Sequence, residues 1–300
     1  KRNSGRFKLE NAGINSKYSD YGTTFVEDKV VFSSARDTGN FSKRIHSWTG
    51  EYFTNLYSAK VAEDGSLGEV EKFGNKLNSK FHEDTPVFTK DGKTVYFTRN
   101  NYLDKRGFND GKVTLLKIYK AKLDDKGKWI DITALPFNSD SYQCAHPTLS
   151  PDGKMMYFVS DMPGSLGKSD LYKVAISDDG TFGTPENLGK TINTEGRETY
   201  PFITAKNELY FSSDGHPGLG GLDIFATKIP EDGMFTNIQN IGEEANSPKD
   251  DFAFIINTDT KRGFLSSNRD GGEGNDDIYK FLETRELFIE QAIFGVVTDA

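Results

Sequence analysis

A repeated sequence unit is the feature that most constrains what this chain can fold into. Among the pairs of asparagine followed by serine or threonine in the 300 residues, five recur at regular intervals of 53 to 63 residues. The five pairs are Asn15-Ser16, Asn78-Ser79, Asn138-Ser139, Asn193-Thr194 and Asn246-Ser247. Because a similar series of short apolar segments follows each pair, we expect five copies of one supersecondary unit.

Each copy contains four short segments with the composition of β-strands, which we name A to D in chain order. Strand A is predicted at 23–26, 86–89, 147–150, 201–204 and 253–256. Turns such as Asp91-Gly92 and Asp152-Gly153 lead into strand B, predicted at 29–34, 94–99, 155–160, 208–213 and 262–267. Strand C follows at 55–57, 117–119, 170–172, 223–225 and 277–279, and a weaker strand D precedes the next pair.

Four-stranded units that repeat without helical periodicity between them predict an all-β fold, the β-propeller. Strand D is missing after the fifth copy, but residues 6–11, just before the first pair, have its pattern. The sequence therefore predicts five blades, the last of which is closed by the N-terminal strand, so that no sheet edge is left open. A degenerate sixth blade is the alternative.

The propeller is predicted to span residues 1–282. Residues 283–300 contain a charged connector and then an apolar segment, 293–299, that is typical of a new strand. We expect this segment to begin a further β-domain.

Composition excludes several classes of partner. The formal net charge is −8 and 13% of the residues are aromatic. An acidic surface repels phosphate groups, so we expect no nucleic-acid binding, and no apolar run approaches the roughly 18 residues that insertion into a membrane requires. The single cysteine, Cys144, excludes an intramolecular disulfide and a cysteine-rich metal cluster. We predict no cofactor and no metal.

Several longer strings resemble the WD40-like propeller region of OmpA-family envelope proteins of Bacteroidetes, over nearly the whole chain. They are 146–153 (HPTLSPDG), 160–164 (SDMPG), 187–194, 219–225 (LGGLDIF), and 266–269 (SSNR) with 276–279 (DDIY). The resemblance implies that 283–300 leads into a carboxypeptidase-regulatory-like domain. It also implies that peptidoglycan is bound only through a domain outside this sequence.

The chain is similar, within that family, to PorE-like components of type IX secretion. This resemblance implies a periplasmic, outer-membrane-associated scaffold whose partners are envelope or secretion-system proteins.

One column of the repeat carries candidate chemistry. Aligning strand A places four acidic residues and Cys144 at equivalent positions: Asp20, Glu83, Glu198 and Asp250. Because strand A lines the channel of a propeller, these carboxylates could ring its mouth and bind a cation or a sugar, as in five-bladed glycosidases. Alternatively, each accepts N–H bonds between neighbouring blades, which explains the recurrence without catalysis, and we favour this interpretation.

Other motifs point to structure rather than chemistry. The segment 271–279 fits a calcium-binding nonapeptide pattern, but a single copy favours a turn between strands B and C, and the aspartates that open strand C are predicted to anchor such loops. The four histidines fall in four different blades without metal-ligand spacing, and Ser165-x-x-Lys168 lies in a glycine-rich turn without a companion motif.

The B-to-C loops differ in length between blades. The first two copies have long insertions at 36–54 and 100–116, whereas the last three have short glycine turns. The insertions carry aromatic and arginine side chains that fit a partner-binding surface: Phe41, Arg44, Trp48, Tyr52, Tyr102, Arg106 and Phe108. These side chains could instead pack on one another or on a neighbouring domain.

The sequence therefore favours a non-enzymatic interaction module that binds protein partners through its loops. A propeller that binds or hydrolyses glycans with the acidic column is the alternative hypothesis.

Overall fold

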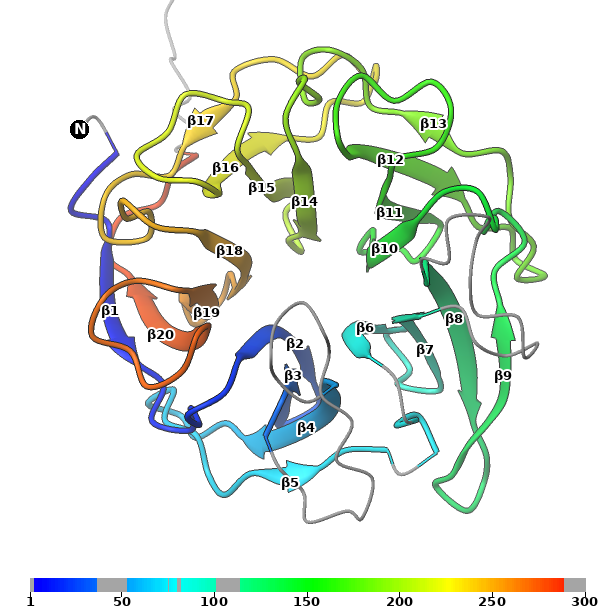
Figure 1. The fold of residues 1–300 in the computed structure, drawn as a ribbon, viewed down its shortest axis with the longest axis horizontal. Coiled ribbons are helices and arrows are strands. Elements are labelled where there is room, and N and C mark those ends of the chain that lie inside the picture. The colour runs from blue at the N-terminus through cyan, green and yellow to red at the C-terminus, as the bar shows by residue number, and fades with distance from the viewer. Residues whose placement is uncertain (1–2, 37–52, 75, 80–81, 101–113, 289–300) are drawn as a thin grey trace, which may run out of the picture.

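The computed structural model describes residues 3–36, 53–74, 76–79, 82–100 and 114–288 (Figure 1). These residues form five antiparallel four-stranded sheets arranged in a ring, and they contain no helix. The prediction of an all-β, five-bladed propeller is confirmed, and a sixth blade is not observed among them.

Each blade presents its strands from the central channel outward. Blade 1 contains β2 (Asp20–Val26), β3 (Lys29–Ser34), β4 (Asn55–Lys60) and β5 (Glu71–Lys72), and blade 2 contains β6 (Glu83–Phe88), β7 (Thr94–Asn100), β8 (Leu116–Leu123) and β9 (Trp129–Ala134). Blade 3 contains β10 (Cys144–Leu149), β11 (Met155–Ser160), β12 (Asp170–Ala175) and β13 (Glu186–Asn187). Blade 4 contains β14 (Glu198–Ile203), β15 (Glu208–Ser213), β16 (Asp223–Lys228) and β17 (Gln239–Asn240). Blade 5 contains β18 (Asp251–Asn257), β19 (Arg262–Ser267), β20 (Asp277–Glu283) and, as its outer strand, β1 (Phe7–Asn11).

The N-terminal strand closes the ring as predicted. β1 runs antiparallel to β20, with Phe7 opposite Glu283 and Asn11 opposite Tyr279. The buried Phe7 ring packs edge-on against Phe281 at 5.1 Å and against Phe254 at 5.9 Å. Closure therefore combines a backbone ladder with an apolar anchor, and it joins the two ends of the described chain.

Blades pack face to face, which explains the composition of strand B. In β3, Val30 and Phe32 enter the cluster shared with blade 5, whereas Val31 enters the cluster shared with blade 2. All three side chains are fully buried. A strand that is covered on both faces shows a continuous apolar run instead of alternation.

Strand A begins earlier than predicted in each blade, by three residues in blades 1 to 4 and by two in blade 5. The pairing of strands A and B shifts register after the second residue, as at Ala145/Thr148 of β10. The residue that follows has a positive φ in all five blades: Gly22, Thr85, His146, Tyr200 and Ala253. This β-bulge breaks the period-two pattern, so sequence alternation located only the second half of the strand.

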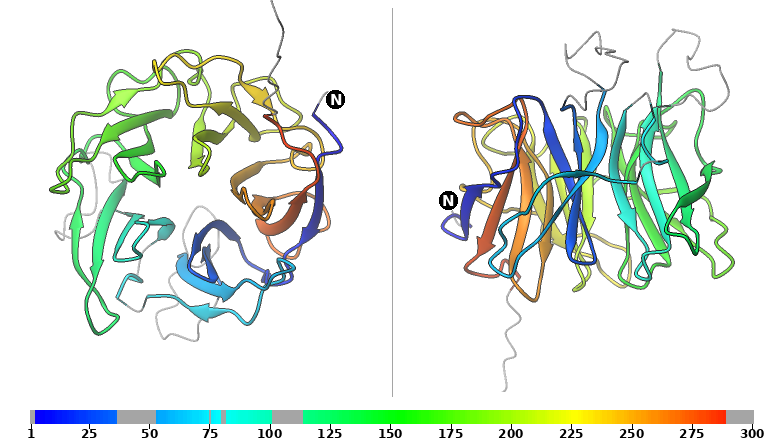
Figure 2. Two further views of the ribbon diagram at one scale, coloured as in Figure 1. Left: turned by 180° about the vertical axis from the view of Figure 1, so that it is seen from behind. Right: turned by 90° about the horizontal axis from the view of Figure 1, so that it is seen from below.

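The ring has two distinct faces. We call the face that carries the B–C loops and the connectors from strand D to the next strand A the insertion face, and the face that carries the A–B and C–D turns the turn face (Figure 2). Both insertions leave the described residues on the insertion face, at Arg36 and Asn100. The chain leaves β20 at Glu283, on the turn face.

Residues 284–288, which follow the last strand, contact the propeller. Leu287 and Phe288 pack against the apolar cluster between blades 4 and 5, and Lys228 lies 6.0 Å from the Phe288 ring. The predicted strand at 293–299 lies outside the described residues, so the following β-domain stays a prediction.

The closure contact yields a stability prediction. We expect Phe7→Ala to lower the free energy of unfolding by about 3–5 kcal/mol, because it removes a buried ring from three-way aromatic packing. Lys8→Ala, on the exposed side of the same strand, should change it by less than about 0.5 kcal/mol. Urea unfolding measures both variants, and equal effects would contradict an apolar role of Phe7 in closure.

Candidate functional site

The structure does not test the predicted loop side chains. Phe41, Arg44, Trp48, Tyr52, Tyr102, Arg106 and Phe108 all lie outside the described residues. What the structure describes is where the two insertions are rooted, and how the acidic column and the channel are built.

The acidic column is buried. The five equivalent first residues of strand A are Asp20, Glu83, Cys144, Glu198 and Asp251, and each has 0% of its surface exposed. The fifth position belongs to Asp251, which pairs with Ser267, and not to Asp250 as predicted. The sequence alignment of the repeats was wrong by one residue here, because two aspartates are adjacent at this position. Asp250 instead accepts a bond of 2.8 Å from the Leu222 N–H of blade 4.

In four of the five repeated pairs, the hydroxyl residue binds the carboxylate four residues later; blade 3 has Cys144 in place of the carboxylate. Thr194 donates its N–H to Glu198 at 2.8 Å and its hydroxyl at 2.7 Å. Ser16 makes the same two bonds to Asp20, Ser79 makes them to Glu83, and Ser247 makes them to Asp251. The four carboxylates are thus hydrogen-bond acceptors for their own connectors.

Cationic side chains complete the carboxylate sites in three blades. Arg36 reaches Asp20 at 2.7 Å, Arg99 reaches Glu83 at 3.0 Å and Arg269 reaches Asp251 at 2.5 Å. Each arginine also donates to the carbonyl immediately before the repeated asparagine: Ile14, Leu77 and Ala245 respectively. In blade 4, Ser213 binds Glu198 and His216 contacts the Ile192 carbonyl at 2.8 Å.

The repeated asparagines join neighbouring blades. Asn193, at the start of blade 4, accepts the Leu171 N–H of blade 3 at 2.8 Å and donates to the Leu171 carbonyl at 3.0 Å. The other four asparagines make the same pair of bonds to strand C of the preceding blade, through Ile278, Leu56, Ile118 and Ile224. The five-fold motif therefore has an architectural function.

The roots of the two insertions meet at one histidine. Thr54, which follows the first insertion, donates its N–H to Nδ1 of His82 at 3.2 Å, and the Phe53 ring lies 4.6 Å from the imidazole. Asn100, which precedes the second insertion, donates its N–H to the His82 carbonyl at 3.4 Å. The end of the first insertion and the start of the second thus share a contact on adjacent blades.

The short B–C loops of blades 3 to 5 are anchored by the predicted aspartates. Asp170, Asp223 and Asp277 each accept two backbone N–H bonds from their own loop. Segment 271–279 joins β19 to β20, so the prediction of a B–C turn is confirmed. Gly274 lies so close to blade 1 that a Cβ there would meet the Tyr18 carbonyl at 2.0 Å.

A belt of contacts crosses the channel and includes one residue from each blade: Tyr21, Thr85, His146, Tyr200 and Phe252. The rings of Tyr21 and Phe252 are 6.1 Å apart, those of Phe252 and Tyr200 are 5.0 Å apart, and those of Tyr200 and His146 are 4.0 Å apart. The Thr85 hydroxyl lies 2.9 Å from Nδ1 of His146.

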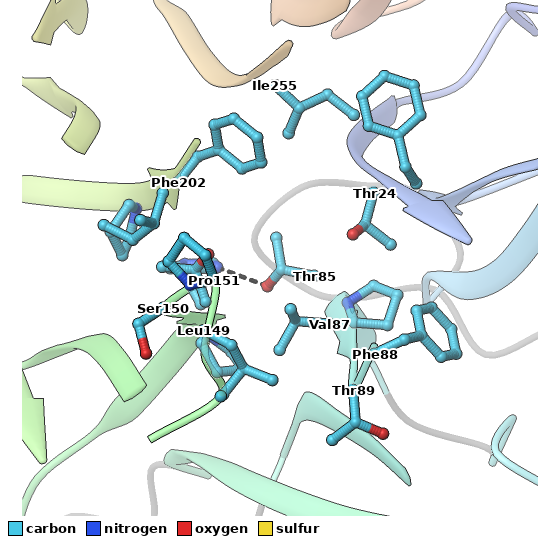
Figure 3. A pocket seen from close by; sticks show the side chains of 18 of the residues that line it. Thr24, Thr85, Val87, Phe88, Thr89, Leu149, Ser150, Pro151, Phe202 and Ile255 are labelled. Carbon is cyan, nitrogen blue, oxygen red and sulfur yellow. Dashed lines mark hydrogen bonds between the residues drawn. The ribbon is translucent and has the colours of Figure 1, made fainter. Parts of the chain in front are cut away.

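A cavity of about 590 Å³ lies between this belt and the turn face. The second halves of all five strands A line it, as shown from close by in Figure 3. The carboxylates of the acidic column are not among the residues that line it.

Burial keeps an acid–base pair of the channel neutral. Oδ2 of Asp84 lies 3.5 Å from Nδ1 of His146, and Oδ1 accepts the Ser33 hydroxyl at 2.9 Å. Desolvation raises the pKa of Asp84 to about 7 and lowers the pKa of His146 to about 3. Both groups are therefore uncharged in weakly acidic solution.

Within the described ranges, no group of three or more histidine, cysteine or carboxylate side chains is arranged to hold a metal ion. The same residues include no helix that is long and apolar enough to cross a bilayer.

The chain matches no family model and no curated protein. Among solved structures, it is similar to a thermostable family-43 glycoside hydrolase (13% identity, TM-score 0.54, covering 94% of each chain). It is also similar to a family-43 β-xylosidase/α-arabinofuranosidase from a compost microbial metagenome (12%, TM-score 0.53, covering 92% of this chain and 93% of that one). TolB from Acinetobacter baumannii matches at 17% identity and a TM-score of 0.42 over 86% of this chain. At such identities the likeness to the two hydrolases shows a shared fold alone. The chain spans 52% of the TolB chain and 46% of a puromycin hydrolase chain that it also matches.

Sequence reasoning missed the belt and the cavity beside it. A usable signal was present, because proline follows the bulge residue in three blades, in Thr85-Pro86, His146-Pro147 and Tyr200-Pro201. Proline cannot donate to a strand ladder and is confined to edges and bulges, so this recurrence marks an irregular, channel-facing strand.

The asparagine motif predicts a stability change. Asn193→Ala should lower the free energy of unfolding by about 1–3 kcal/mol, because it leaves the buried N–H of Leu171 without a partner and leaves the Leu171 carbonyl with the Leu188 N–H as its remaining donor. Thr191→Ala, exposed in the same connector, serves as the control and should change it by less than about 0.5 kcal/mol. Chemical unfolding of both variants tests this, and an unchanged Asn193→Ala would show that water replaces the amide.

The channel pair predicts a pH dependence with a definite sign. Between about pH 3.8 and 7, folded Asp84 keeps a proton that the unfolded chain has lost, so its contribution to stability falls as pH rises. Between about pH 3 and 6.5, the unfolded chain binds a proton that folded His146 does not, so this contribution rises with pH. The two slopes offset each other in the wild type.

Replacing either residue of the pair should leave the pH dependence of stability that is due to the other residue. In Asp84→Asn, the free energy of unfolding should rise by up to about 1.4 kcal/mol per pH unit between pH 4 and 6.5, relative to wild type. In His146→Gln it should fall over the same range. Urea titrations at half-unit pH intervals measure this, and parallel profiles for the three proteins would contradict the assignment.

Proposed function

We propose that this chain is the interaction module of an envelope scaffold protein and that it binds a protein partner on its insertion face. One observation carries the proposal: the end of the first long insertion and the start of the second, on adjacent blades, share a contact at His82, on the face opposite the point where the chain leaves the ring. Loops held by a rigid scaffold are where binding residues gather in proteins.

The rigidity of that scaffold has a physical origin. The connector of each blade is bonded to the preceding blade through asparagine, and in four of the five blades it is also bonded to its own strand A through the carboxylate. Loop roots on such a frame lose little conformational entropy when a partner binds, which favours affinity.

The alternative function, glycan binding or hydrolysis by the acidic column, has weaker geometric support. Hydrolysis needs two carboxyl groups that face one substrate, usually about 5–9 Å apart. Asp20, Glu83, Glu198 and Asp251 are fully buried and bonded to their own connectors, and Asp250 anchors a loop. The described carboxylates therefore support an architectural role better than a catalytic one.

The finer proposal concerns location and partner. The sequence resemblance supports a periplasmic, outer-membrane-associated protein that binds components of the type IX secretion machinery. The candidate contact residues are those of the two insertions.

A capture experiment tests the insertion face. We expect the purified chain, immobilised and incubated with detergent-solubilised envelope of its source, to retain specific envelope proteins identified by mass spectrometry. The variant Trp48→Ala/Tyr102→Ala/Phe108→Ala should retain at least about tenfold less of the partner than the wild type does, because aromatic anchors carry much of the energy of an interface.

The control variant alters the opposite face. Lys90→Ala/Lys126→Ala/Met234→Ala changes three exposed side chains of the turns and should retain the partner as the wild type does. Equal melting temperatures of both variants would exclude unfolding as the cause. If the control variant alone fails to retain the partner, the interface lies on the turn face instead. Release of sugar from aryl glycosides by the wild type would favour the alternative function.

A further inference from the structure

We propose that the central channel contains a binding site for a small, uncharged and largely apolar molecule, which enters from the turn face. The site is the cavity of about 590 Å³ between the belt and the A–B turns. Its volume lies in the range of roughly 300–1,000 Å³ that is typical of small-molecule sites. This inference is independent of the proposed function, which concerns the insertion face.

The belt bounds one end of the cavity. Tyr200, His146 and Thr85 belong both to the belt and to the cavity lining. On the insertion side of these residues, Tyr21 and Phe252 pack with Leu222 and Ala253 in an apolar cluster. The floor of the cavity, formed by these three residues, is therefore backed by apolar side chains toward the insertion face.

The walls combine apolar side chains with several threonines. Val87, Leu149, Phe202 and Ile255 come from four different blades and surround the cavity in Figure 3. Pro86, Pro147 and Pro201 line it as well, and proline has no N–H to offer a ligand. A lining of this composition favours an apolar ligand over an extended peptide that would need backbone donors.

Charged side chains are confined to the mouth. Among the residues that line the cavity, the charged ones are Lys90, Asp91 and Asp152, and all three are exposed in A–B turns. At the floor, Nδ1 of His146 is held beside the Thr85 hydroxyl within the buried belt. A charged ligand would lose its hydration without gaining an opposite charge inside, whereas an uncharged ligand would not.

One polar group of the lining is unpartnered. The Thr23 hydroxyl is buried and makes no hydrogen bond to any residue that the structure describes, although Thr23 lines the cavity and is only 4% exposed. A buried hydroxyl without a partner is costly, and rotation of the Thr23 side chain toward the cavity would let a ligand with a single acceptor or donor satisfy it. The site thus suits an apolar body with one hydrogen-bonding group.

The cavity is also preorganised. The bulge residues at its floor have positive φ values, including 38° at the β-branched Thr85 and 49° at Tyr200. Such conformations persist where surrounding structure holds them and gather at functional sites. Prolines in the next position stiffen three of the five walls, so little conformational entropy would be lost when a ligand binds.

Fluorescence tests the site with the intact chain and a defined probe. N-phenyl-1-naphthylamine is uncharged, apolar and carries one N–H, and we expect it to brighten on binding with a micromolar dissociation constant. Thr24→Trp, which places a large ring in the cavity, should weaken binding at least about tenfold. Thr133→Trp, on the exposed outer strand β9, is the matched control and should bind like the wild type.

A second probe and a second variant keep the test decisive. 8-Anilino-1-naphthalenesulfonate has the same rings with a sulfonate and should bind at least about tenfold more weakly than the uncharged probe. Thr24→Asp adds a charge instead of a large ring. It should weaken binding of the uncharged probe, so the site can be tested even if Thr24→Trp fails to fold. Equal binding of both probes, equal binding by a folded Thr24 variant and the wild type, or no binding to the folded wild type would overturn the proposal.

Discussion

The hydrogen-bonded connector between blades is the interaction on which the rest of the structure depends. In each connector an asparagine side chain pairs with both backbone groups of a strand C residue in the preceding blade, for example Asn246 with Ile224. In four of the five connectors, the next residue binds a buried carboxylate that opens the following strand A, as Ser247 binds Asp251. Buried polar groups of this kind are stabilising only when every partner is present, so the motif specifies how one blade is placed on the next.

The placement of the blades sets the geometry of the channel. Five strands A enter the ring with the same bulge, and this brings one side chain from each blade into the belt from Tyr21 to Thr85. The belt separates two environments along a single axis. Toward the insertion face lie buried carboxylates and arginines, and toward the turn face lies an apolar cavity. The two proposals, a protein partner and a small apolar ligand, belong to these two sides.

Much of the architecture was predictable from the sequence because the repeat encodes it locally. Strand B is apolar on both faces, Asp-Gly marks the A–B turns of blades 2 and 3, and the N-terminal segment has the pattern of the missing outer strand, so blade number and closure followed directly. The start of strand A was not predictable, because the bulge breaks the alternation on which strand prediction relies. The acidic column was found, but adjacent aspartates at 250 and 251 left its last member ambiguous until the pairing with Ser267 was known.

The sequence by itself thus determined the class of fold, the number of blades and the chemical identity of the repeated motif, since each of these depends on residues close together in the chain. Only the tertiary structure decided what those residues face. It showed that the carboxylates are enclosed by their own connectors, and that Asp84, His146 and Tyr200, from three different blades, meet in the channel. The physical reason is that burial and side-chain direction in a ring depend on the packing of whole blades, which no local pattern records.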